Sequence, residues 1–144
     1  MGSDVDGQAT DELFGQSIAL SADGLIFAAG GPGAAAEADG LARVYALDAG
    51  SATWVQMGAD IAAADAGDNA GRPVAISADG LRVAVGSHKA DPGGMSDAGH
   101  VRVFDYDGSD WQQLGLMPGA RILLFARRAA DGRPVAVRER GRPS

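Results

Sequence analysis

The chain has 144 residues, a formal net charge of −7, a hydrophobic content of 46% and no cysteine, which excludes a disulfide framework and a thiolate site. No run of about 20 apolar residues is present, so we expect no membrane span, and residues 1–15 lack the basic and apolar regions of a signal peptide. An acidic body repels phosphate backbones, so we expect no nucleic-acid partner.

Residues 1–14 are an acidic lead-in, and the first strand pattern follows them. Residues 17–20 and 25–30 flank the sequence SADG, and Asp-Gly is typical of a tight hairpin turn. Residues 42–47, ARVYAL, alternate as a strand with one buried face does, and residues 54–57, WVQM, close the unit. We therefore predict a four-stranded antiparallel blade over residues 15–58.

The same pattern then occurs a second time. Residues 71–86 match residues 15–30 without a gap at an offset of 56, with 9 of 16 positions identical. Further along, residues 99–115 repeat the pattern of residues 40–58. A period near 50 residues predicts an array of similar β units, so residues 71–115 form a second blade.

The segments between strands are predicted as loops. Residues 59–70 form an inter-blade loop rich in Asp, Ala and Gly. The alanine-rich stretches 34–38 and 62–66 are too short to form stable helices unaided. Residues 87–98 connect two strands of the second blade and differ most from their counterpart in the first.

The tail, residues 116–144, contains seven arginines and two acidic residues, unlike the acidic remainder of the chain. Such a tail either is solvated or meets an anionic partner. Residues 121–126 and 130–137 predict a hairpin from a third blade, because ADGRPVAV matches residues 78–85, ADGLRVAV. The predicted fold class is all-β, a partial β-propeller with two four-stranded antiparallel blades and this hairpin.

Residues 4–115 resemble the FG-GAP repeats of β-propellers related to the head of integrin α chains. The resemblance rests on F-G-x-S-[IV]-A-[LI]-S-A-D-G, a G-x-[VA]-R-V-[YF] strand and a closing Trp; Phe14-Gly15 supplies the name-giving pair, and Ala70-Gly71 replaces it in the second copy. The resemblance implies adhesion or ligand binding on an extracellular or cell-surface face. It also implies calcium in D-x-[DN]-x-D-G loops, but that sequence is absent, so we expect no cofactor, with calcium as the alternative.

One long loop concentrates the polar residues that suit binding. We predict a binding loop formed by His88, Lys89, Asp91, Asp97 and His100, since loops on a sheet scaffold carry recognition. Two histidines with carboxylates are also adequate ligands for zinc, although this spacing matches no metal motif.

Two other features have competing interpretations. Asp105, Asp107 and Asp110 offer oxygens to calcium, but Asp-Gly between two strands is ordinary turn chemistry. Trp54 and Trp111 close equivalent strands, so we predict structural packing between neighbouring sheets rather than sugar stacking.

The predicted function is a non-enzymatic binding module that recognises a protein or a glycan through its inter-strand loops. Two blades cannot close a ring, so an open stack leaves two sheet faces available for self-association. The alternatives are a truncated propeller fragment without independent function, and a small metal-dependent enzyme that uses the His88 loop.

Overall fold

The computed structural model describes residues 3–34 and 38–115. These residues are all-β, and those up to Leu114 belong to one compact unit. The predicted hairpin of a third blade, within residues 121–137, lies outside the described residues.

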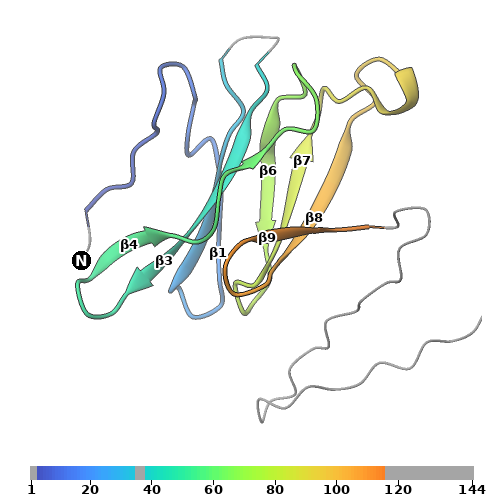
Figure 1. Ribbon diagram of the computed structural model, residues 1–144. Coiled ribbons are helices and arrows are strands. Elements are labelled where there is room, and N and C mark those ends of the chain that lie inside the picture. Colours follow the sequence, from blue (N-terminus) through green and yellow to red (C-terminus); the bar gives the residue numbers. More distant parts are fainter. Residues whose placement is uncertain (1–2, 35–37, 116–144) are drawn as a thin grey trace, which may run out of the picture. The chain divides into compact units, whose positions relative to one another are not determined.

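The described residues form two antiparallel sheets, as the repeat predicts (Figure 1). The first sheet has the order β1-β2-β3-β4, and a further short strand, β5, pairs with β3. Its strands are β1 (Ser17–Leu20), β2 (Ile26–Gly31), β3 (Leu41–Asp48), β4 (Thr53–Gln56) and β5 (Ile61–Ala62). The second sheet has the order β6-β7-β8-β9. Its strands are β6 (Ala70–Ile76), β7 (Arg82–Ser87), β8 (His100–Tyr106) and β9 (Trp111–Leu114).

The prediction of a pure loop at residues 59–70 is wrong at β5. Ile61 and Ala62 pair with the beginning of β3, on the edge that β4 occupies further along that strand. Ile61 is 4% exposed and belongs to the core, which explains why the chain returns to the sheet here. A two-residue strand shows no alternation, so the sequence pattern could not indicate it.

The SADG turns are held by the same hydrogen bonds in both copies. The Ser21 hydroxyl donates to Asp23 Oδ1 at 2.7 Å, and the Leu25 amide donates to the same oxygen at 2.9 Å. Gly24 has a φ of +73°, which glycine adopts without strain. The second copy repeats both bonds, at 2.6 and 3.0 Å, through Ser77, Asp79 and Leu81. The Ser and Asp side chains therefore hold each turn locally, and the Ala22 amide joins the two turns by donating to the Ala78 carbonyl at 3.0 Å.

The core lies between the two sheets. Both sheets contribute aliphatic side chains, and the two aromatic ones come from the second sheet. These residues are Ala28, Ala42, Val44 and Ile61 from the first sheet, and Ala70, Val74, Val83, Val85, Phe104 and Trp111 from the second. The indole of Trp111 also donates a hydrogen bond to the carbonyl of Met57 at 2.7 Å, which joins the sheets at their strand ends.

Glycines allow the two backbones to touch where β6 begins. A Cβ added at Gly30 would lie 1.7 Å from the Gly71 carbonyl oxygen, and one at Gly40 would lie 2.2 Å from the Ala70 carbonyl oxygen. The Ala70 amide donates to the Asp39 carbonyl at 2.8 Å across the same contact. A side chain at either glycine would separate the sheets, so these positions require glycine.

Candidate functional site: the loops at one end of the sheets

Several connections lie at one end of the two sheets, opposite the SADG turns (Figure 1). They are the lead-in, the β2–β3 loop, the β5–β6 loop and the β7–β8 loop. The Asn69 side-chain amide donates to the carbonyls of Pro32 and Ala38 at 2.9 Å each. The Lys89 amide donates to the Asp68 carbonyl at 3.3 Å. These bonds join loops from both sheets into one surface.

The first cleft on this surface is acidic. It has a volume of about 390 Å³ and lies between the β5–β6 and β7–β8 loops. Its polar lining consists of Asp65, Asp68, Lys89, Asp91, Ser96 and Asp97. Four acidic residues and one lysine therefore line the cleft, although the Asp68 side chain is only 4% exposed.

A second cleft, of about 300 Å³, has the opposite charge. Arg72, His88 and Lys89 line it together with residues of the lead-in and of the β2–β3 loop. Lys89 borders both clefts, so it separates an acidic surface from a basic one.

The β7–β8 loop is shaped by its own hydrogen bonds. It contains the 3₁₀ turn η1 (Pro92–Gly94), and the Asp97 amide donates to Asp91 Oδ1 at 2.7 Å. The Gly99 amide donates to the Ala90 carbonyl at 2.8 Å, and Ala90 itself is buried. One function of Asp91 is thus to close the loop, whereas Asp97 is exposed at the cleft.

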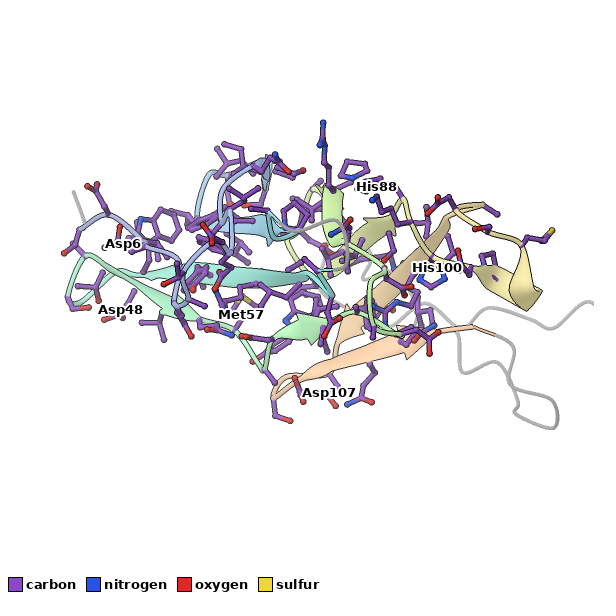
Figure 2. All side chains as sticks on the ribbon, turned by 90° about the horizontal axis from the view of Figure 1, so that it is seen from above. Asp6, Asp48, Met57, His88, His100 and Asp107 are labelled. Atoms are coloured by element: carbon purple, nitrogen blue, oxygen red, sulfur yellow. The ribbon has the colours of Figure 1, made fainter. Side chains whose placement is uncertain are left out.

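The structure brings four of the five predicted loop residues to this surface. His88, Lys89, Asp91 and Asp97 line the clefts, but His100 does not. His100 begins β8, and its Nε2 lies 3.9 Å from Asp68 Oδ2 in a partly buried position. The two histidines lie apart in Figure 2. Among the described residues, no group of three or more His, Cys, Asp or Glu side chains is placed to hold a metal ion.

A buried polar cluster beside His100 was not predicted from the sequence. Asp68 and Ser87 are almost fully buried. In the described part of the chain, Ser87 Oγ, His100 Nε2 and Arg102 Nε are buried atoms without a hydrogen-bond partner. Burial lowers the pKa of Arg102, while Asp68 and Asp65 counteract that shift. The sequence indicates only Arg102, which repeats Arg43 of the first copy.

Arg43 forms a second buried polar centre, on the face of the first sheet that points away from the second sheet. Its Nη1 lies 2.5 Å from Glu12 Oε1, and its Nε lies 2.9 Å from Asp60 Oδ1. The guanidinium also lies over the Phe14 ring, 5.3 Å from its centroid. Burial acts to lower the pKa of Arg43, but the hydrogen bonds that it donates to Asp60 and Glu12 raise it overall. These contacts fasten the lead-in to β3.

The acidic turn between β8 and β9 has structural partners for each carboxylate. Asp105 pairs with Arg82, and Asp107 Oδ1 accepts hydrogen bonds from the Ser109 and Asp110 amides at 2.9 Å each. The Asp110 backbone amide is the main reason why the pKa of Asp107 is lowered. The turn lies apart from both histidines (Figure 2), and its geometry is that of an Asx turn.

The two tryptophans have different surroundings, although they are equivalent in sequence. Trp111 is 8% exposed and packs between the sheets, as predicted. Trp54 is half-buried on the opposite face of the first sheet, edge-on to Phe27 with ring centroids 4.8 Å apart. Trp54 therefore does not lie between the two described sheets, and its predicted packing against a neighbouring sheet stays a prediction.

Comparison with models of protein families gives no match for this sequence, and comparison with curated proteins gives none either. Among the described residues, no helix has the length and apolar character that a membrane crossing requires.

Proposed function

We propose that this chain is a non-enzymatic binding module made of two propeller-type blades of the FG-GAP kind. It recognises a protein or a glycan through the loops at the β7–β8 end. The observation that carries the proposal is the convergence of loops from both sheets around Lys89, with an acidic cleft on one side and a basic cleft on the other.

The arrangement separates recognition from stability. The β7–β8 loop connects two core strands, so it is anchored at both ends, while its cleft residues contribute little to the core. Loops on such scaffolds can change without disturbing the fold. The corresponding β2–β3 loop of the first sheet has no histidine and is shorter, so the two blades present different surfaces.

A metal-dependent enzyme based on His88 has no such support. His88 lines the basic cleft, while His100 is turned towards Asp68. The two imidazoles do not converge on a common point with carboxylates among the described residues.

Binding can be tested by screening the full chain against a glycan microarray and a displayed peptide library. Any ligand found is then titrated against His88→Ala and Asp97→Ala, one variant for each cleft. We expect at least one of them to weaken binding about tenfold, while the free energy of unfolding stays within about 0.5 kcal/mol.

Gln113→Ala is the matched control, because Gln113 is also exposed but lies on β9. Equal affinity of the wild type and both cleft variants would contradict the proposal. So would loss of binding confined to Trp54→Ala, because the aromatic face would then be the site.

A further inference from the structure

Equivalent residues of the two sheets differ sharply in exposure on one face. Ile18 of β1 and Val74 of β6 occupy the same position in the repeat, yet Ile18 is 72% exposed and Val74 only 7%. The next residue on that face shows the same difference. Leu20 is 63% exposed, while its equivalent Ile76 packs against the core.

The other face shows the reverse difference. Ala42 of β3 is fully buried, whereas its equivalent Val101 of β8 is 67% exposed. Ala28 is also fully buried, while its equivalent Ala84 is half-buried. An exposed valine in the middle of a strand leaves apolar surface in water, which is unfavourable.

These differences define two outer faces. Side chains alternate across a strand, so each sheet has one face in the core and one outside it. Outer face 1, on the first sheet, comprises Ile18, Leu20, Phe27, Tyr45 and Trp54. Within it, Tyr45 is only 6% exposed, because the Phe14 ring of the lead-in packs edge-on against it. Outer face 2, on the second sheet, comprises Ala75, Ala84, Val101, Val103 and Leu114.

The outer faces correspond to the two halves of the interface that already exists inside the chain. The residues equivalent to outer face 1 are those with which the second sheet packs on the first. The residues equivalent to outer face 2 are those of the first sheet that contact the second sheet in the core. Outer face 1 therefore has the pattern of side chains that outer face 2 would accept.

The glycines that the internal interface requires are present at the outer faces as well. Gly30 and Gly40 receive the backbone of β6, and their equivalents in the second sheet are Gly86 and Gly99. A Cβ built at Gly86 would lie 2.8 Å from Pro73 Cδ, so a residue of the same sheet already approaches this glycine. Gly71 approaches the Leu41 carbonyl, and its equivalent is Gly15. No described atom lies within 4 Å of a Cβ built at Gly15, so the close approach that this glycine permits is not used.

The lead-in has the backbone course of the segment before β6. Leu13 and its equivalent Asn69 both have positive φ, +55° and +50°, and Gly15 and Gly71 follow at +88° and +99°. The segment ending at Asn69 passes beside the internal interface without preventing it. The lead-in covers Tyr45 with the Phe14 ring, but it leaves Ile18 and Leu20 of outer face 1 exposed, so a similar contact is open over β1.

We propose that a second copy of this chain docks head to tail, with its outer face 1 on outer face 2 of the first copy. The contact repeats the internal packing of the second sheet on the first. Such a heterologous contact leaves one open face at each end of a dimer, so further copies can add until a ring closes or a filament forms. The second copy fits because its outer face 1 has side chains and glycines equivalent to those with which the second sheet packs on the first.

The proposal is tested by sedimentation velocity of the full chain from about 1 to about 100 μM. We expect the mean mass to rise with concentration. Ile18→Asp and Val101→Asp each place a charge in one outer face, and each should weaken association about tenfold or more. Val55→Asp is the matched control, because Val55 is 53% exposed but lies outside both outer faces.

A mixture of the two variants gives the decisive result. Ile18→Asp retains outer face 2, and Val101→Asp retains outer face 1, so together they should form a 1:1 dimer that grows no further. Recovery of this dimer also shows that both variants are folded. If Val101→Asp abolishes association while Ile18→Asp does not, the contact is face to face and the head-to-tail proposal is overturned.

A wild-type chain that stays monomeric at every concentration also overturns the proposal. Thiol labelling of a Val101→Cys variant then identifies the reason. Fast labelling means that outer face 2 is open and does not bind a second copy. Slow labelling means that the same chain covers it, with residues 116–144 as the segment to delete next.

Discussion

Arg43 in the first sheet and Arg102 in the second occupy equivalent positions with different partners. Arg43 is paired with Glu12 and Asp60. Arg102 donates from Nη2 to the Ala62 carbonyl, and its Nε is a buried atom without a hydrogen-bond partner among the described residues. The repeat therefore preserves the arginine, whereas the supply of carboxylates depends on the surroundings of each sheet.

Two physical causes explain this difference. The acidic residue at this position is shorter in the second copy, and other groups compete with the arginine for its carboxylate. Glu12 reaches Arg43, whereas its equivalent in the second copy is Asp68, which is shorter by one methylene. Asp68 Oδ2 accepts a hydrogen bond from the Asp65 amide at 3.1 Å and lies 3.9 Å from His100 Nε2. The comparison shows that identical positions in a repeat are not identical in energy. The residues around each position decide how much it contributes to stability.

The largest expected effect concerns the two tryptophans. Trp111→Ala should destabilise the protein by about 3–5 kcal/mol, because it leaves a cavity between the sheets and an unpaired Met57 carbonyl. At concentrations too low for self-association, Trp54→Ala should cost clearly less, because Trp54 is then half-exposed. Urea unfolding monitored by circular dichroism measures both. Equal losses would show that Trp54 is also buried in solution, as self-association at outer face 1 would cause.

The arginines should show a second difference between the sheets. Arg43→Ala leaves the nearly buried Glu12 carboxylate without its main partner, and breaking such a pair costs about 3–5 kcal/mol. Arg102→Ala removes a poorly paired charge and should cost less. The double variant Glu12→Gln/Arg43→Met is the control, and it should recover part of the loss. Equal destabilisation by the two single variants would contradict the difference in pairing.

The smallest effect should be the same in both sheets. Hydrogen bonds from Ser21 and Ser77 are the main causes that lower the pKa of Asp23 and Asp79 below 3.8. A lowered pKa in the folded state stabilises the fold above the unfolded pKa, and this contribution is lost as the pH falls through the folded pKa. Stability should therefore decrease below about pH 4.

Asp23→Asn and Asp79→Asn should each make this acid dependence less steep, and by similar amounts. Unfolding in urea between about pH 5 and pH 2 measures the slope. Asp107→Asn serves as the comparison, because its pKa is also lowered, by a different turn. A marked difference between Asp23→Asn and Asp79→Asn would mean that the two SADG turns are not equivalent in solution.

Apart from β5, the sequence by itself determined the strands of the described residues and their SADG turns. Alternation indicated β3 and β8, and SADG indicated two hairpins whose Ser–Asp hydrogen bonds lie within each turn. These features are local, because the residues that form them are neighbours along the chain. The repeat also indicated that one kind of unit occurs twice, which the two sheets confirm.

The candidate site was only partly predictable. The β7–β8 loop could be identified from its polar residues, since a loop must join two strands of one sheet. The contribution of Asp65 and Asp68 from another loop, and the separation of His100 from His88, could not. Both depend on how the two sheets stack.

Tertiary structure alone decided which faces are covered. Ile18 and Val74 have nearly the same side chain in the same local pattern, yet one is exposed and the other buried. Burial depends on a neighbouring sheet that approaches from far along the sequence, and no local pattern contains that information. For the same reason β5 and the pairing of Arg43 with Glu12 and Asp60 became visible only in the folded chain.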